Sequence, residues 1–294
     1  MRVGIIGVPF NSAAQTDAEA GAPAALRAAD LVATLAPLGD VTDRGDVDVP
    51  SGSAERDGES GLIAPETFLA MTANVRAAVT SAYRDGQMPL ILGGDSAVLL
   101  GGLLAARDQL GYGAGLLFVD GHEDAWPPFG SVTGEAGDME LGLALGLSRP
   151  DKLGDLGAEL PVVDPNEVAL LGPRDADELR SEGIESVRHR VIVMNDGELR
   201  DAGVAMTVQR WLKHFGNRPG RFWFHLDLDV LSTEANPAVS YPQPGGLAWD
   251  EVSEIIRIVF AAEHLIGIDI TGYNPDKDAD GTVANALVAA LAGA

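Results

Sequence analysis

Residues 114–124 read AGLLFVDGHED, and residues 221–229 read RFWFHLDLD. In each segment an uninterrupted apolar run leads directly into acidic residues and histidines that are spaced two apart. Side chains spaced by two point to the same side of a strand or of its extension. The polar side chains of each segment are therefore expected to converge: Asp120, His122 and Asp124 in the first, Asp227 and Asp229 in the second.

Clustered carboxylates of this kind need a cation. Two unit charges about 4 Å apart repel by about 4 kcal/mol at an effective dielectric of about 20. A single Asp-x-Asp at a strand end is more often a turn or a helix cap than a ligand set. Here two such segments follow buried strands, and open α/β sheets bind ligands at the carboxyl ends of strands. Because carboxylates with one imidazole favour Mn²⁺ over a structural zinc ion, the sequence predicts a divalent-metal site.

Strand-like and helix-like runs alternate along the chain. The strands are rich in Val, Ile, Leu and Phe without polar alternation, which is typical of a parallel sheet covered on both faces. This predicts an α/β fold, a three-layer αβα sandwich around a mostly parallel sheet of about eight strands, with residues 1–294 as one domain. The expected strands lie at 3–8, 40–43, 88–93, 114–120, 167–171, 189–194, 221–230 and 264–270. The expected helices lie at 22–36, 65–84, 97–109, 138–146, 175–182, 205–215, 249–262 and 281–292.

The composition of the chain argues against several classes of partner and of chemistry. The chain has 294 residues, a net charge of −24 and no cysteine. The negative charge argues against nucleic acids and anionic membranes as partners, and the lack of cysteine excludes disulfides, thiolate ligands and a cysteine nucleophile. No apolar stretch approaches the roughly 20 residues of a membrane span. The apolar run at 3–8 is too short for the core of a signal peptide, so we expect a cytoplasmic protein.

The ordered motifs resemble those of the ureohydrolase superfamily, which includes arginase, agmatinase and formimidoylglutamase. Its signatures are Gly-Gly-Asp-His, Asp-Ala-His-x-Asp and Ser-x-Asp-x-Asp-x-x-Asp-Pro. This chain carries, in the same order, Gly93-Gly94-Asp95-Ser96, Asp120-Gly121-His122-Glu123-Asp124 and His225-Leu226-Asp227-Leu228-Asp229. Weaker matches extend the resemblance over most of the chain, at residues 44–46, 171–174, 242–247 and 267–270. Departures from the pattern mark the chain as a divergent member.

The resemblance implies an αβα fold, two Mn²⁺ ions, and hydrolysis of a guanidine or amidine C–N bond. Carried over residue by residue, it implies that Asp120, His122, Asp227 and Asp229 hold one ion. The other ion would be held by Asp120, Asp124 and Asp227, with Asp120 and Asp227 bridging the two. The family also commonly forms dimers, trimers or hexamers, which implies a homo-oligomer.

One departure concerns a metal ligand. The family's histidine in the first motif is Ser96 here. A neutral hydroxyl is a poorer ligand than imidazole, so the ion that lacks the histidine is expected to bind more weakly than the other. The expected content is therefore one or two Mn²⁺ per chain. His225 lies two positions before Asp227 and faces the same way. It either supplies an imidazole to the metal or to the leaving group, or it is a strand histidine satisfied by hydrogen bonds.

Other departures concern the substrate. The family's glutamate that holds the guanidinium aligns with Gly272, and the histidine that arginases use as a proton shuttle aligns with Gly137. Glu135 and Asp138 are candidate substrate-binding groups beside Gly137, with Glu140 nearby, although acidic residues at a helix start are usually caps. By the same resemblance, the Asn-Thr-Pro stretch that grips the carboxylate of an amino acid in arginase is replaced by Pro127-Pro128-Phe129, so L-arginine is not the expected substrate.

Three functions remain open. The first is a Mn²⁺-dependent hydrolase of a small linear guanidino or amidino compound, with His122, Glu123, Asp124 and His225 as candidate catalytic residues. The second is a catalytically impaired relative that keeps one metal ion and acts as a binding or assembly module. The third is a metal-dependent amide deacetylase of related fold, which ranks last because the sequence contains no tandem His-His to act as general base.

Overall fold

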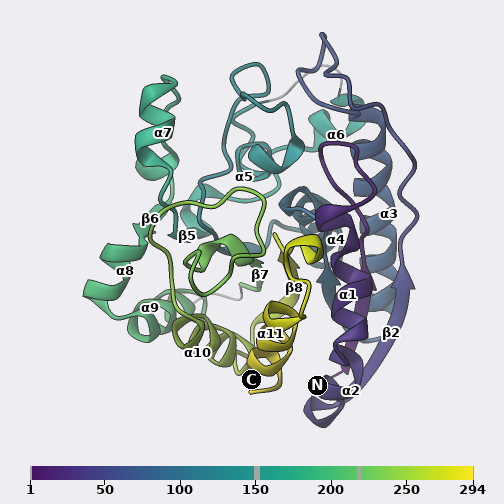
Figure 1. The fold of residues 1–294 in the computed structure, drawn as a ribbon, viewed down its shortest axis with the longest axis vertical. Coiled ribbons are helices and arrows are strands. Elements are labelled where there is room, and N and C mark those ends of the chain that lie inside the picture. The colour runs from purple at the N-terminus through teal and green to yellow at the C-terminus, as the bar shows by residue number, and fades with distance from the viewer. Residues whose placement is uncertain (1, 149–152, 217–219, 294) are drawn as a thin grey trace.

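Eight parallel strands form one sheet in the computed structural model, which describes residues 2–148, 153–216 and 220–293 (Figure 1). Their order across the sheet is β2-β1-β3-β8-β7-β4-β5-β6, and every neighbouring pair is parallel. Each strand overlaps one that the sequence predicts. The strands are β1 (Arg2–Gly7), β2 (Asp40–Asp46), β3 (Met88–Leu92), β4 (Gly115–Val119), β5 (Val168–Gly172), β6 (Ile192–Asn195), β7 (Phe222–Asp227) and β8 (Leu265–Thr271).

Helices cover both faces of the sheet, because successive apolar residues of a strand pack in opposite directions. In β4, Leu116 and Phe118 belong to one hydrophobic cluster, whereas Leu117 and Val119 belong to the other. The predicted three-layer αβα sandwich is therefore confirmed. The helices that join the first cluster are α3 (Pro65–Arg84), α4 (Leu99–Leu110), α5 (Glu140–Ala144), α6 (Gly154–Glu159) and α7 (Ala176–Ser181). Those that join the second are α1 (Ala22–Ala28), α2 (Leu31–Leu35), α8 (Asp196–Ala202), α9 (Val204–Gly216), α10 (Trp249–Phe260) and α11 (Thr282–Ala292).

The helices differ from the prediction in two respects. The helix expected at 22–36 is divided into α1 and α2 at Asp30, which has a left-handed φ of 58°. Asp adopts this conformation more readily than most residues do. The sequence also missed α6 and α8, which are too short to show apolar periodicity. Within the described part of the chain, no helix is both long enough and apolar enough to cross a membrane.

The strand register places the two acidic segments next to each other. β4 and β7 are neighbours, with Val119 opposite Leu226. The residues that follow, Asp120 and Asp227, therefore lie at the same edge of the sheet. On the other side of β7, β8 places Asp269 opposite His225.

Trp223 fills a space in the core that glycines leave open. Its side chain is fully buried, in the middle of β7. A Cβ atom at Gly267 of β8 would lie 2.1 Å from the indole, and one at Gly102 of α4 would lie 2.5 Å from it. The indole N–H donates a hydrogen bond to Asp269. The packing of α4, β7 and β8 is therefore coupled to the polar groups at the centre of the sheet.

We predict that Gly267→Ala lowers the free energy of unfolding by about 1–3 kcal/mol, because the added methyl group overlaps the indole of Trp223. Gly58→Ala is the control, since a Cβ atom there meets nothing within 4 Å and the residue is exposed. Urea unfolding of the two variants measures the difference. Equal stability of both variants would contradict the close packing around the indole.

Candidate metal centre

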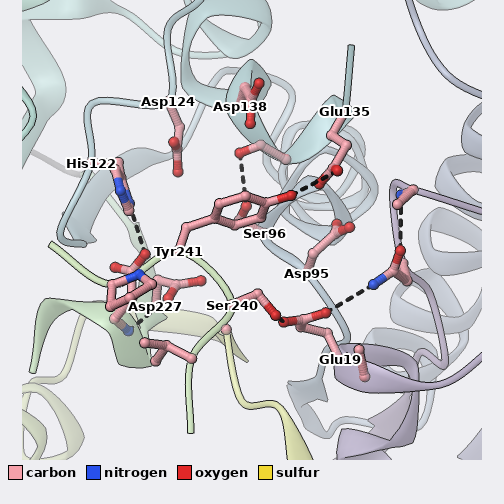
Figure 2. A pocket seen from close by; sticks show the side chains of 18 of the residues that line it. Glu19, Asp95, Ser96, His122, Asp124, Glu135, Asp138, Asp227, Ser240 and Tyr241 are labelled. Atoms are coloured by element: carbon pink, nitrogen blue, oxygen red, sulfur yellow. Dashed lines mark hydrogen bonds and ion pairs between the residues drawn. The ribbon is translucent and has the colours of Figure 1, made fainter. Parts of the chain in front are cut away.

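The carboxyl ends of β4 and β7 open into a cavity of about 380 Å³. His122, Asp124, Asp227 and Asp229 line it, and Figure 2 shows the side chains of the first three facing the same space. No Lys or Arg is found among the described residues that line the cavity. The cavity is therefore strongly acidic, as the two strand-end motifs predict.

Asp120 is the common member of three groups of candidate metal ligands. The ligand atoms within each group lie within 4.8 Å of one another. Asp120 is fully buried, and one of its oxygens accepts a hydrogen bond of 2.7 Å from the backbone N–H of His122. Burial and the charge of Asp229 raise the pKa of Asp120. The three groups are Asp120–His122–Asp229, Asp120–His225–Asp227 and Asp120–Asp124–Glu140.

His122 and Asp229 form an ion pair at the cavity. Nδ1 of His122 lies 2.7 Å from Oδ2 of Asp229. The other oxygen of Asp229 accepts a hydrogen bond of 2.8 Å from the N–H of Gly121. Although burial lowers it, the charge of Asp229 and the hydrogen bond to it raise the pKa of His122 to about 10. The imidazolium neutralises Asp229 in the metal-free protein, and a metal ion held by His122 and Asp229 would take over this role from the proton.

Asp227 is fixed by two donors. One oxygen accepts from the backbone N–H of Asp229 at 2.8 Å, and the other accepts from the hydroxyl of Thr271 at 2.7 Å. Gly272 has a φ of +72°, and a Cβ atom there would lie 1.9 Å from an oxygen of Asp227. The chain therefore has no room for a side chain at Gly272, so the family's guanidinium-binding glutamate has no counterpart at this position.

His225 lies behind the cavity and is fully buried. Its Nδ1 bonds to Asp269, and its Nε2 lies 3.4 Å from an oxygen of Asp120. The ring of Phe118 stacks on it, with centroids 4.2 Å apart. Both ring nitrogens therefore have carboxylate partners, as expected of a strand histidine satisfied by hydrogen bonds. It does not line the cavity, so the structure does not bring it to a leaving group.

The structure does not bring Glu123 to the cavity. Its carboxylate accepts hydrogen bonds from the Ser186 hydroxyl at 2.7 Å and from the Val187 N–H at 2.8 Å. Glu123 alternates with the ligand-type residues at 122 and 124, so it points to the opposite side of the segment. Its contacts stabilise the chain around residues 186–187.

Ser96 lines the cavity, but its hydroxyl donates to the carbonyl of Gly137 at 3.1 Å. The preceding Asp95 accepts hydrogen bonds from the backbone N–H groups of Ser12 and Ala97. Burial raises the pKa of Asp95 to about 7. Ser96 therefore stands beside the acidic cluster, with its hydroxyl proton committed to the backbone.

Glu140 is a residue of the acidic cluster that the sequence interpretation did not assign as a ligand. It is the first residue of α5 and is fully buried. Neither of its carboxylate oxygens has a hydrogen-bond partner within the described residues. Burial raises its pKa well above the usual value, and burial together with the charge of Glu140 does the same for Asp124. The one signal in the sequence is that Glu140 opens the apolar run LGLALGL.

Further carboxylates surround the mouth of the cavity. The phenol of Tyr241 donates to Glu135 at 2.8 Å and lies across the cavity in Figure 2. Asp138 accepts a hydrogen bond of 2.6 Å from the Ser131 hydroxyl. Glu19, which the sequence interpretation did not identify, accepts from Asn11 and Ser240. The two predicted substrate-binding acids, Glu135 and Asp138, thus lie on the cavity together.

The donor set fits a divalent-metal centre. Five buried carboxylates stand within or beside the three groups, and two imidazoles are the only candidate cations that those groups contain. Unpartnered carboxylate oxygens, as at Glu140, are costly unless a proton or a cation neutralises them. Carboxylate and imidazole donors without thiolates suit Mn²⁺.

Comparison with known proteins shows the family of the chain. The sequence model of the arginase family matches residues 1–294. The chain belongs to the arginase family. It is 28% identical over 290 residues to an arginase from Brevibacillus brevis, covering 98% of this chain and 95% of that one. These matches confirm the ureohydrolase resemblance, and the chain is an arginase-family hydrolase.

Solved structures match the fold of this arginase-family chain. The native structure of arginase from Bacillus caldovelox has a TM-score of 0.86 and 25% identity, covering 99% of this chain and 97% of that chain. Formimidoylglutamase from Bacillus subtilis has a TM-score of 0.72 and 20% identity, covering 100% of this chain and 86% of that chain. The latter likeness concerns the fold alone.

We predict that the metal-free protein loses stability as the pH rises from about 5 to about 8. Groups such as Asp95, with a pKa raised to about 7, and Asp124 and Glu140 keep protons in the fold that the unfolded chain has released. The folded state therefore binds more protons, so the free energy of unfolding falls with pH. His122, with a pKa raised to about 10, acts in the same direction above neutrality.

Urea unfolding at each pH, with EDTA or with saturating Mn²⁺, measures this dependence. Metal binding releases protons, so the stabilisation that Mn²⁺ provides should grow over the same pH range. Metal-free stability that rises with pH would show that the acidic cluster is not buried and protonated in this way.

Proposed function

We propose that the protein is a Mn²⁺-dependent hydrolase that cleaves a C–N bond of a small linear guanidino or amidino compound other than L-arginine. The observation that carries the proposal is that His122, Asp227 and Asp229 line one cavity while the buried Asp120 shares a group of candidate ligands with each of them. These four residues would hold one ion. Asp120, Asp124 and Asp227 would contribute to a second, so that Asp120 and Asp227 are shared.

The residues at the cavity have distinct roles in this proposal. When bound, divalent ions lower the pKa of water and polarise a planar carbon. Asp124 lies against the cavity with a φ of 41°, and its carboxylate faces the space that a substrate would occupy. We assign to Asp124 the acceptance of the proton that water releases. His225 orients Asp120 from behind, through the chain of contacts from Asp269.

The charge of the cavity argues for a cationic substrate. Glu19, Asp95, Glu135 and Asp138 line it, and no Lys or Arg joins them among the described lining residues. The excess of acidic residues disfavours the carboxylate of an amino acid, whereas it attracts a guanidinium or amidinium ion. The relatives named arginase support the reaction class, and the acidic lining supports a substrate without a carboxylate.

A substrate panel tests the proposed function. Purified protein with Mn²⁺ is expected to release urea, formamide or ammonia from at least one linear guanidine or formimino compound, and EDTA should abolish the release. A carboxylate-bearing substrate such as L-arginine should have the lower kcat/KM. Protein that binds Mn²⁺ but hydrolyses none of the panel would favour a binding or assembly module, and efficient L-arginine cleavage would contradict the substrate class.

Glu135→Gln should raise KM for the cationic substrate by about 5- to 30-fold, with a smaller effect on kcat. The change removes one negative charge from the mouth of the cavity and keeps the volume of the side chain, and a charge-assisted hydrogen bond contributes about 1–2 kcal/mol. Glu254→Gln is the control, because this residue bonds to Arg257 on α10 and does not line the cavity. Steady-state kinetics measure both variants, and an unchanged KM in Glu135→Gln would remove Glu135 from the substrate site.

A further inference from the structure

We propose that Glu140 is a ligand of the second metal ion, in the position where the family pattern places the histidine that is Ser96 in this chain. The inference rests on the proposed metal dependence and concerns how this particular chain completes its second site. The oxygen of Glu140 lies within 4.8 Å of ligand oxygens of Asp120 and Asp124. Asp120 and Asp124 come from the segment that directly follows β4, and Glu140 comes from the first turn of α5.

The isolation of Glu140 distinguishes it from a structural carboxylate. Glu123, Asp227 and Asp269 are also buried, but each accepts hydrogen bonds from donors that neutralise part of its charge. Glu140 is fully buried, and among the described residues its oxygens have no hydrogen-bond partner of good geometry; the group beside it is another carboxyl, that of Asp124. A buried carboxylate without donors is costly, so a cation between Glu140 and its acidic neighbours supplies what the protein does not.

Ser96 does not fill this role. Its hydroxyl donates to the carbonyl of Gly137 at 3.1 Å, and Gly137 in turn donates from its N–H to the hydroxyl of Ser12 at 3.1 Å. The loss of an imidazole at position 96 is therefore balanced by a carboxylate at position 140.

The exchange of an imidazole ligand for a carboxylate ligand changes which metal ions the site binds most tightly. The group Asp120–Asp124–Glu140 offers only oxygen donors, whereas Asp120–His122–Asp229 offers an imidazole as well. Oxygen ligands favour hard ions such as Mn²⁺ and Mg²⁺, and imidazole suits Zn²⁺ and Ni²⁺. We infer that the two metal positions differ in selectivity. In competition with Zn²⁺, the position beside Glu140 should retain Mn²⁺ better than a site with a histidine ligand would.

Glu140→Gln tests the inference, because it keeps the shape of the side chain and removes the charge. Ser96→Ala is the matched control, since it removes only the hydroxyl. Equilibrium dialysis against Mn²⁺ with elemental analysis measures the number of ions and their affinities, without any assay of turnover. The wild type should bind about two ions per chain, Glu140→Gln should weaken the second ion by at least about tenfold, and Ser96→Ala should stay within about twofold of the wild type.

Two further measurements separate ligation from damage to the fold. Metal-free Glu140→Gln should unfold at a higher urea concentration than the metal-free wild type, because a buried acid has been replaced by a neutral amide. Glu140→Asp keeps the charge but withdraws the carboxylate by one methylene, so it should weaken the second ion less than Glu140→Gln does.

The outcomes distinguish this inference from the proposed function. Two ions with unchanged affinities in Glu140→Gln, or loss of the second ion in Ser96→Ala, would overturn the role of Glu140 and leave the hydrolase proposal in place. A wild type that binds a single ion would also overturn the role of Glu140. A wild type that binds no Mn²⁺ would overturn both.

Discussion

Mutual repulsion among Asp120, Asp124, Asp227 and Asp229 governs how the protein is built around its cavity. These carboxylates are buried at the carboxyl ends of adjacent parallel strands, where bulk water cannot screen them. The metal-free fold tolerates them by keeping protons on several and by an ion pair with His122. The hydrogen bonds that the backbone and Thr271 donate to these carboxylates hold them close together in spite of this repulsion.

The core of the sheet holds these groups in place. A continuous path of contacts leads from the indole of Trp223 through Asp269 and His225 to Asp120. On the other side, the guanidinium of Arg174 donates to the backbone carbonyls of Asp229 at 2.7 Å and Val230 at 3.0 Å. The ligand-bearing backbone is thereby fixed from both directions, and side chains fixed in advance lose little freedom when a metal ion binds.

The sequence predicted what depends on local pattern and missed what depends on tertiary contact. Seven of the strands were visible as apolar runs and the exposed β2 only weakly, and spacing by two placed Asp120, His122 and Asp124 on one side. The same rule puts Glu123 on the opposite side, where it binds Ser186 and Val187, so its catalytic role had no geometric basis. Glu140 and Glu19 could not be assigned because their neighbours are distant in the chain, and an acidic residue at a helix start is ordinarily a cap.

The link between the buried indole of Trp223 and the polar network has a consequence for observing the protein. The N–H of the indole is bonded to Asp269, whose other oxygen bonds to His225. Any redistribution of charge on that imidazole changes the electric field at a chromophore shielded from solvent. The fluorescence of Trp223 should therefore respond to changes in the charge of His225 and Asp269, so that these changes can be followed without a label.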